Sequence, residues 1–159
     1  MTDWVKITRT FDADIQTVWE MWAVPENFQK WYGPMGFSVP VAEMDVTVGG
    51  TRKINMAMET PDRKMSMWFT GTYKEVSAPH RLVYTESMCD PDGNVISPAD
   101  MGMPAGTPDV TEITVELSEE GGKTVMVMTH VGVPAGTPGE GGWNMAFDKL
   151  VAALDAGKT

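Results

Sequence analysis

Apolar and polar residues alternate at the start of the chain and then change to a helical spacing. Segment 4–11 (WVKITRTF) has the period of two that is typical of a half-buried strand. From 15 to 22 the apolar residues recur three and four positions apart, as on one face of a helix, and Asp12 or Asp14 can cap its first turn. A second short helix is predicted over 25–31, because a proline interrupts the first.

A period of two returns after these helices and continues through most of the remaining chain. Stretches rich in Gly, Pro and Asp divide this part into separate strands. Strands are predicted over residues 37–46, 51–59, 65–76, 81–88, 110–117 and 124–133, and a long helix over 143–154, ending near Gly157. The order of one strand, two short helices, six strands and a long helix predicts an α+β fold with a mostly antiparallel sheet.

Two hairpins indicate which side chains face the interior of this sheet. In the last hairpin the polar positions between 112 and 116 favour water, so the residues that alternate with them point inward. Placing Leu117 opposite Thr124 pairs the inward positions as Val115 with Met126, Ile113 with Met128 and Thr111 with His130. In the earlier hairpin the inward pairs are Met58 with Met65, Met56 with Met67 and Ile54 with Phe69.

Methionine is unusually frequent, with fourteen copies, and it concentrates on this inward face. Six copies form three pairs spaced by two: Met56 and Met58, Met65 and Met67, and Met126 and Met128. Thioethers also bind Cu(I), but this spacing equals the strand period, so we expect no metal and no cofactor. The methionines therefore predict either a filled core or the wall of a ligand cavity between the sheet and the C-terminal helix.

The acidic balance of the chain restricts its partners. Twenty-two Asp and Glu against twelve Lys and Arg give a net charge of −10, which argues against nucleic acid or an anionic membrane as the partner. The single cysteine excludes an internal disulfide framework. The 159 residues suit one domain over 1–159, and the sequence shows neither a secretion signal nor an apolar run of ~20 residues. We expect a cytoplasmic protein.

Three polar residues share the inward face and are candidates for ligand contacts. His130 can act as an acid or base near neutral pH or orient a ligand, although a core histidine bonded to the backbone has the same pattern. Glu86 lies on an inward face, so it needs a partner such as His130 or Arg52 unless it lies at a solvated rim. Arg52 can bind a ligand carboxylate in a bidentate way or reach water from the start of its strand.

Four segments stand in an order that matches a known family. They are ITRTFDADIQTVWEMWAVPENFQKWYGP (7–34), DVTVGG (45–50), GTYKEVSAPHRLVYTE (71–86) and GGWNMAFDKLVAAL (141–154). Together they resemble the START-like (SRPBCC) superfamily, and within it the small bacterial proteins related to the C-terminal domain of the activator of the ninety-kilodalton heat-shock chaperone's ATPase. This resemblance implies a helix-grip fold, in which a curved seven-stranded antiparallel sheet wraps around a long C-terminal helix.

The resemblance also implies a ligand cavity between the sheet and the C-terminal helix, where superfamily members bind lipids, steroids, polyketides or plant hormones. We therefore predict a protein that binds a hydrophobic or amphipathic small molecule there. The loop over 90–107 is long and rich in Pro and Gly, and we expect it to be a lid. The predicted ligand contacts are the polar His130, Glu86 and Arg52, together with Met56, Met58, Met67, Phe69, Tyr84, Met126, Met128, Trp143 and Phe147.

Two other functions remain open at this point. One is a small-molecule enzyme, similar to a cyclase or hydrolase, that uses His130 or Glu86. The other is a chaperone cofactor or stress-related interaction protein, and small members of the superfamily are often homodimers. A pocket with converging polar groups favours binding or catalysis, whereas a filled interior with a large exposed apolar patch favours a protein partner.

Overall fold

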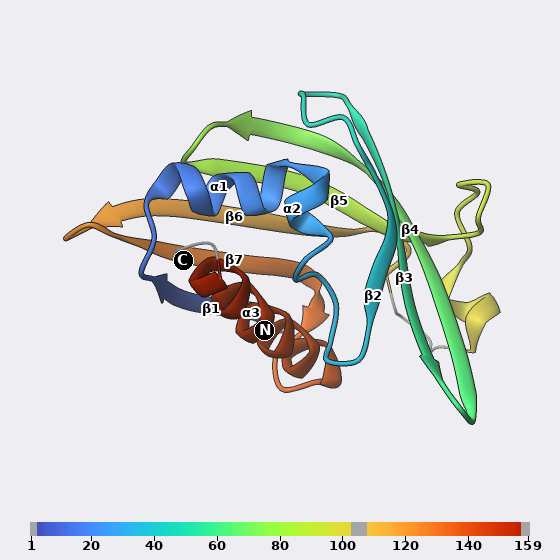
Figure 1. Cartoon of the computed structure of the whole chain (residues 1–159). Helices are drawn as coiled ribbons and strands as arrows, with labels where there is room; N and C mark the ends of the chain where they lie inside the picture. The colour runs from blue at the N-terminus through green and yellow to red at the C-terminus, as the bar shows by residue number, and fades with distance from the viewer. Residues whose placement is uncertain (1–2, 103–107, 157–159) are drawn as a thin grey trace.

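The computed structural model describes residues 3–102 and 108–156, which form a curved sheet with helices on one side (Figure 1). The strands are β1 (Trp4–Phe11), β2 (Ser38–Met44), β3 (Thr51–Thr60), β4 (Arg63–Ser77), β5 (Arg81–Cys89), β6 (Thr111–Glu120) and β7 (Lys123–Pro134). The helices are α1 (Ile15–Ala23), α2 (Pro25–Phe28) and α3 (Pro138–Ala156), with a short 3-10 helix, η1 (Pro98–Met101). The predicted order of elements is confirmed, and η1 is an addition within the long loop.

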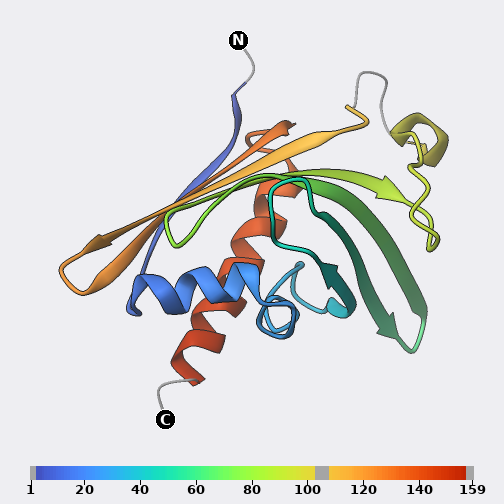
Figure 2. The same ribbon diagram turned by 90° about the horizontal axis from the view of Figure 1, so that it is seen from above.

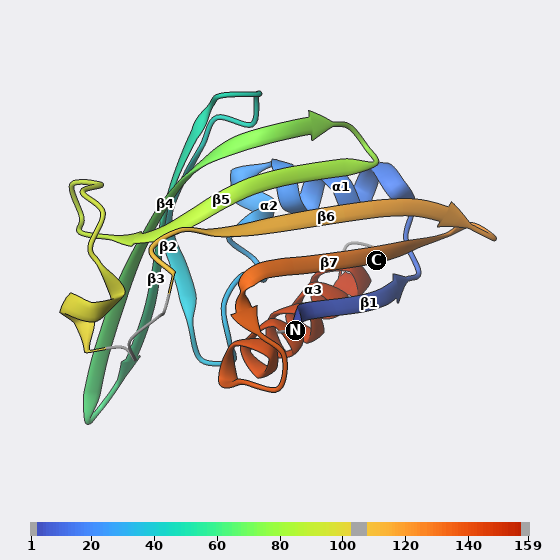
Figure 3. The ribbon, with the colours of Figure 1, turned by 180° about the vertical axis from the view of Figure 1, so that it is seen from behind.

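All seven strands belong to one antiparallel sheet in the order β1-β7-β6-β5-β4-β3-β2. Figure 2 shows the sheet bending around α3, with α1 and α2 on the same concave side. From behind, Figure 3 shows the convex face of β5, β6 and β7 without a helix in front of it. The predicted α+β fold is therefore confirmed: a curved antiparallel sheet wraps around a long C-terminal helix, and two short helices follow the first strand.

The two short helices begin where the sequence provides suitable residues. Of the two candidate caps, Asp14 is used, because its carboxylate accepts a hydrogen bond from the backbone N–H of Thr17 at 2.7 Å. Pro25 occupies the first turn of α2, where its missing N–H leaves no helical bond unmade. Trp22 of α1 and Phe28 of α2 are both buried, so the two helices cover part of the concave face.

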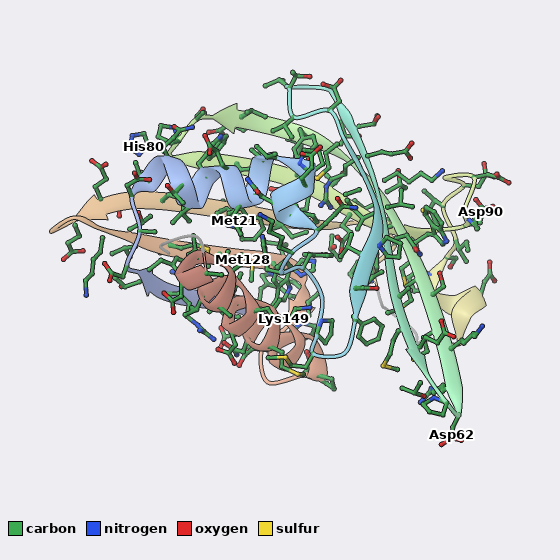
Figure 4. The ribbon with its side chains drawn as sticks, viewed as in Figure 1. Met21, Asp62, His80, Asp90, Met128 and Lys149 are labelled. Atoms are coloured by element: carbon green, nitrogen blue, oxygen red, sulfur yellow. The ribbon has the colours of Figure 1, made fainter. Side chains whose placement is uncertain are left out.

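The β3–β4 hairpin has the predicted register. Met58 lies opposite Met65, and Met56 lies opposite Met67. Met56 is buried, whereas the other three are half-buried along the part of the hairpin that projects beyond the helices. Figure 4 marks Asp62 at the tip of this projection. The methionines of this hairpin thus range from core to partly solvated positions.

The register predicted for the last hairpin is wrong by two residues. Leu117 of β6 lies opposite Met126 of β7 and not opposite Thr124. The cause is a tight two-residue turn, in which Gly121 and Gly122 have φ angles of +60° and +81°. A shift by an even number of residues leaves every side chain on its face, so Met126 still points inward and is buried.

Aromatic side chains from α1, α2, α3 and the segment after α2 fill most of the space on the concave face. The ring of Trp22 lies 4.7–6.4 Å, between ring centres, from those of Phe28, Trp31, Trp143 and Phe147. Both inward methionines of β7 belong to the same buried cluster. Most of the space between the sheet and the helices is therefore a filled core and not a cavity.

Candidate functional site

A pocket of about 190 Å³ interrupts this core near the start of α3. It lies between α3, the segment that follows α2, and the inner faces of β3, β4, β5 and β7. Apolar and small residues make most of its wall. The residues that line it are Tyr32, Gly33, Pro34, Met56, Phe69, Glu86, His130, Pro138, Gly139, Gly142, Trp143 and Ala146.

Small residues at the start of α3 leave the space for this pocket. The helix begins at Pro138, within a stretch that the sequence pattern predicted as loop, because proline is favoured in the first turn of a helix. Gly139, Gly142 and Ala146 follow at spacings of three and four, so they share one helix face, and all three line the pocket. From Phe147 onward, large buried side chains fill the space instead. The pocket therefore results from missing side chains at one end of an otherwise packed helix.

Lys149 of α3 holds the loop that forms the outer wall of the pocket. Its Nζ donates hydrogen bonds to the carbonyl oxygens of Tyr32, Pro34 and Phe37, at 3.2, 3.3 and 3.2 Å. Figure 4 shows Lys149 on α3, beside the segment that connects α2 to β2. Partial burial lowers the pKa of Lys149 from its ordinary value. Gly33 in this loop has a φ of +90°, a backbone conformation that L side chains rarely adopt, so the wall favours glycine at this position.

A buried ion pair lies at the floor of the pocket. Glu86 of β5 accepts two hydrogen bonds at Oε2, from the hydroxyl of Tyr32 at 2.9 Å and from Nη1 of Arg52 at 3.3 Å. Arg52 of β3 is only 2% exposed, its Nε donates to the hydroxyl of Tyr73 at 3.3 Å, and its guanidinium carbon lies 4.0 Å from the ring centre of Tyr84. Arg52 is therefore the partner of Glu86, which was one of the two partners predicted for it. Arg52 does not reach water from the start of its strand.

The protonation states around this pair follow from burial and from the neighbouring charges. Burial, together with the nearby carboxylate of Glu86, raises the pKa of Tyr32 well above its ordinary value, so the phenol remains a hydrogen-bond donor. Burial opposes the charge of Arg52, but Tyr84, Tyr73 and Glu86 outweigh this effect and hold the pKa of Arg52 above its ordinary value. The guanidinium therefore stays charged beneath the pocket.

A chain of hydrogen bonds runs from α3 into the sheet beside this pair. The indole Nε1 of Trp143 donates to Nδ1 of His130 at 3.0 Å, so Nδ1 is the acceptor and the ring proton lies on Nε2. Nε2 then donates to the hydroxyl of Thr111 at 2.8 Å, and this hydroxyl donates to the backbone oxygen of Glu86 at 3.3 Å. Both nitrogens of His130 are thus engaged within the protein, and the neutral ring serves to orient Trp143.

Comparison with known proteins assigns this arrangement to a family. The model of the family described as Activator of Hsp90 ATPase homolog 1-like protein, AHSA1, matches residues 12–155. The chain belongs to this family. The predicted resemblance is thereby confirmed, and the fold of AHSA1 proteins commonly binds hydrophobic ligands. A search of curated proteins finds no match to the sequence.

Solved structures of bacterial proteins agree with the AHSA1 assignment. A protein from Chromobacterium violaceum is 25% identical, with a TM-score of 0.74 over 93% of this chain and 94% of that chain. A protein from Arthrobacter aurescens is 26% identical, with a TM-score of 0.74 over 95% of this chain and 85% of that chain. A protein from Staphylococcus epidermidis is 25% identical, with a TM-score of 0.74 over 98% of this chain and 92% of that chain.

The ligand contacts predicted for this AHSA1 chain fall into two groups. The residues that line the pocket are Met56, Phe69, Glu86, His130 and Trp143. Those that do not line it are Arg52 and Tyr84, which pack together beside Glu86; Met58 and Met67, along the β3–β4 hairpin; and Met126, Met128 and Phe147, in the core. The structure therefore brings together all three polar candidates, two of them at the pocket and Arg52 next to it.

Sequence reasoning missed the residues that make the pocket possible. Tyr32 was not considered, although it stands directly before Gly33 and Pro34, which end the helical spacing. The small residues of PGEGG were interpreted as a loop, although they continue into the helical face of Trp143. The missed lining residues are Tyr32, Gly33, Pro34, Pro138, Gly139, Gly142 and Ala146.

Phe69, Glu86 and His130 also line a second cavity of about 160 Å³. Pro98 of η1 and Asp109, from the two sides of the long loop, line it as well. The lid predicted over 90–107 includes residues 103–107, which lie outside the described residues, so it stays a prediction.

Within residues 3–102 and 108–156, no three His, Cys, Asp or Glu side chains are grouped so that they could hold a metal ion. In the same ranges, every helix is too short or too polar to cross a membrane.

The histidine of this site makes the stability of the protein depend on pH. Burial lowers the pKa of His130 below its ordinary value of 6.5, although Glu86 acts in the opposite direction. The unfolded chain regains the ordinary pKa and binds the proton more readily below about pH 6.5. Stability contributed by neutral His130 is therefore present above about pH 6.5 and is lost as the pH falls, by up to about 1.4 kcal/mol per pH unit. Urea unfolding at about pH 7.5 and 5.5 measures this loss.

Two glutamine variants isolate the contribution of His130. The loss between the two pH values should shrink in His130→Gln and persist in His80→Gln, because His80 is exposed on the surface. An unchanged pH dependence in His130→Gln would contradict the assignment of the neutral ring.

Proposed function

We propose that this protein binds a small apolar or amphipathic molecule in the pocket between α3 and the concave face of the sheet. The observation that carries the proposal is the missing side chain at Gly142, on a helix whose buried side is otherwise filled by Phe147 and Leu150. A Cβ at Gly142 would have one atom within 4 Å, a ring carbon of Pro34 at 3.4 Å, whereas a Cβ at Gly139 would lie 2.7 Å from a side-chain carbon of Val133. Gly142 therefore marks the open part of this wall.

The size of the pocket limits this occupant. Its volume of about 190 Å³ is below the ~300–1,000 Å³ of sites for drug-sized ligands. It exceeds the ~150 Å³ of an engineered apolar cavity that holds benzene. The proposal therefore concerns molecules of about one ring, and larger ligands require the pocket to open toward the neighbouring cavity behind Phe69.

Filling the pocket from the helix side tests the proposal. In Gly142→Leu the new side chain would occupy the pocket, because a Cβ at this position lies 3.4 Å from Pro34, which lines the same pocket. Gly141→Leu is the matched control, because Gly141 is exposed and a Cβ there meets no atom within 4 Å. Binding of fluorobenzene, followed by ¹⁹F NMR, should weaken at least about tenfold in Gly142→Leu and remain in Gly141→Leu.

Native mass spectrometry of freshly purified protein provides an independent test. A small molecule retained by the wild type and by Gly141→Leu, but absent from Gly142→Leu, would identify the natural occupant. Equal retention by both variants, or equal binding of fluorobenzene, would place the binding site elsewhere and overturn the proposal.

The two alternative functions receive no specific support from the site. Both nitrogens of His130 are bonded within the protein, so this ring has no free nitrogen to act as an acid or base toward the pocket, and Oε2 of Glu86 is held by Tyr32 and Arg52. Catalysis, a role as a chaperone cofactor and a homodimer stay predictions.

A further inference from the structure

The polar side chains that line the pocket are largely satisfied by one another. Tyr32 and Trp143 each use their single donor within the protein, and His130 uses both ring nitrogens. Glu86 differs, because both hydrogen bonds to its carboxylate converge on Oε2 and no described residue donates to Oε1. Among the described residues, some buried polar atoms lack a hydrogen-bond partner, and Oε1 is not one of them. Oε1 is therefore not enclosed by protein. Oε1 is therefore an accessible acceptor of a residue that lines both the pocket and the second cavity.

We propose that the pocket selects a neutral molecule with one aromatic ring and one hydrogen-bond donor, such as a phenol, and that the donor binds Oε1 of Glu86. The proposal rests on the function proposed above and names the ligand class of the same site.

The charges beneath the pocket favour a neutral ligand. An anion would face the carboxylate of Glu86, which offers only acceptor atoms. A cation would face Arg52, whose Nη1 lies 3.3 Å from Oε2 and compensates the carboxylate already. Because Arg52 is almost completely buried, its charge is poorly screened by solvent, and a second cation close to it is disfavoured. A neutral hydroxyl or N–H can donate to Oε1 without changing this balance.

The walls favour a single aromatic ring. Tyr32, Phe69 and Trp143 present aromatic side chains to the pocket, and Met56 presents a polarisable thioether, which packs well against rings. The volume of about 190 Å³ accommodates a benzene-sized ring with a small substituent. With Glu86 at the floor, the substituent that carries the donor points inward and the ring lies between the aromatic walls.

Four probes of similar size test the proposal on the unmodified protein. Phenol carries the donor, toluene replaces its hydroxyl by a methyl group, anisole keeps the oxygen without the proton, and benzylammonium carries a charge. Titrations followed by ¹⁵N NMR, including the indole N–H of Trp143, give the four Kd values. We expect phenol to bind about tenfold or more tightly than toluene and anisole, since a hydrogen bond to a carboxylate is a strong one, and benzylammonium to bind no more tightly than toluene.

The Gly142→Leu variant separates the two proposals. If all the neutral probes bind equally and are lost in Gly142→Leu, the pocket is a binding site, but the donor selection is overturned. Tightest binding of benzylammonium overturns it in favour of a cation. If no probe shows binding that depends on Gly142, the proposed function itself fails.

A variant at the carboxylate adds a second criterion. In Glu86→Gln the side chain keeps its shape but loses its charge, so the preference for phenol over toluene should fall severalfold while toluene binding remains. If a folded Glu86→Gln protein still prefers phenol over toluene to the same extent, the hydroxyl does not bind Glu86 and the proposal is overturned. Because the four-probe comparison needs no variant, it decides the question even if Glu86→Gln does not fold.

Discussion

Replacing Arg52 by methionine is expected to lower the free energy of unfolding by about 3–5 kcal/mol. Methionine fills a similar volume, but the carboxylate of Glu86 loses its cation while only 8% of the residue is exposed. The hydroxyl of Tyr73 also loses its hydrogen bond from Arg52. Urea unfolding near neutral pH, followed by tryptophan fluorescence, measures the change.

A surface arginine provides the matched control. Arg81 bonds Glu75 at 3.1 Å and Glu116 at 2.9 Å, but its side chain is 41% exposed. Solvent screens these pairs, so Arg81→Met should cost no more than about 1 kcal/mol. The double variant Arg52→Met/Glu86→Leu should recover much of the loss, because it removes the unpaired charge. If Arg52→Met and Arg81→Met lower the free energy of unfolding equally, burial does not strengthen the contribution of Arg52 to stability.

Replacing Phe147 by alanine is also expected to lower the free energy of unfolding by about 3–5 kcal/mol. Its side chain is completely buried, and its ring centre lies 6.1 Å from Trp22, 6.0 Å from Trp31 and 5.5 Å from Trp143. Removing the ring leaves a cavity inside a packed cluster. Thermal and urea unfolding measure the effect, with Met145→Ala as control, since Met145 lies on the same helix and is 38% exposed.

The size of this effect distinguishes core from pocket wall. Met145→Ala should change the stability by no more than about 0.5 kcal/mol. If Phe147→Ala costs as little as Met145→Ala, the ring would not be held in a packed cluster, and Phe147 would belong to a loosely filled pocket as the sequence alone predicts.

The sequence predicted the fold because periodicity depends on local geometry. Alternation along β3 and β4 was sufficient to pair Met56 with Met67, and the helical spacing from Trp143 to Leu154 was sufficient to orient α3. Even the error in the β6–β7 register left Met126 on its correct face, because the shift is even. Faces of strands and helices can therefore be predicted without knowing the exact pairing.

The pocket could not be predicted in the same way. Arg52 and Glu86 belong to β3 and β5, which are separated by β4, so their contact depends on how strongly the sheet bends. Hydrophobic patterns report the side chains that are present, whereas this pocket lies beside Gly142, which has none. The methionine pairs left a filled core and a cavity wall both open, and the structure places Met126 and Met128 in the core but Met56 at the pocket.

The ammonium of Lys149 affects how quickly a ligand can enter or leave. A lysine has three N–H donors, and the three carbonyls that Lys149 reaches use all of them. Three hydrogen bonds therefore hold the outer wall of the pocket to the helix opposite it. We expect the residence time of a ligand beside this wall to depend on the lifetime of these three hydrogen bonds as well as on the ligand's own contacts.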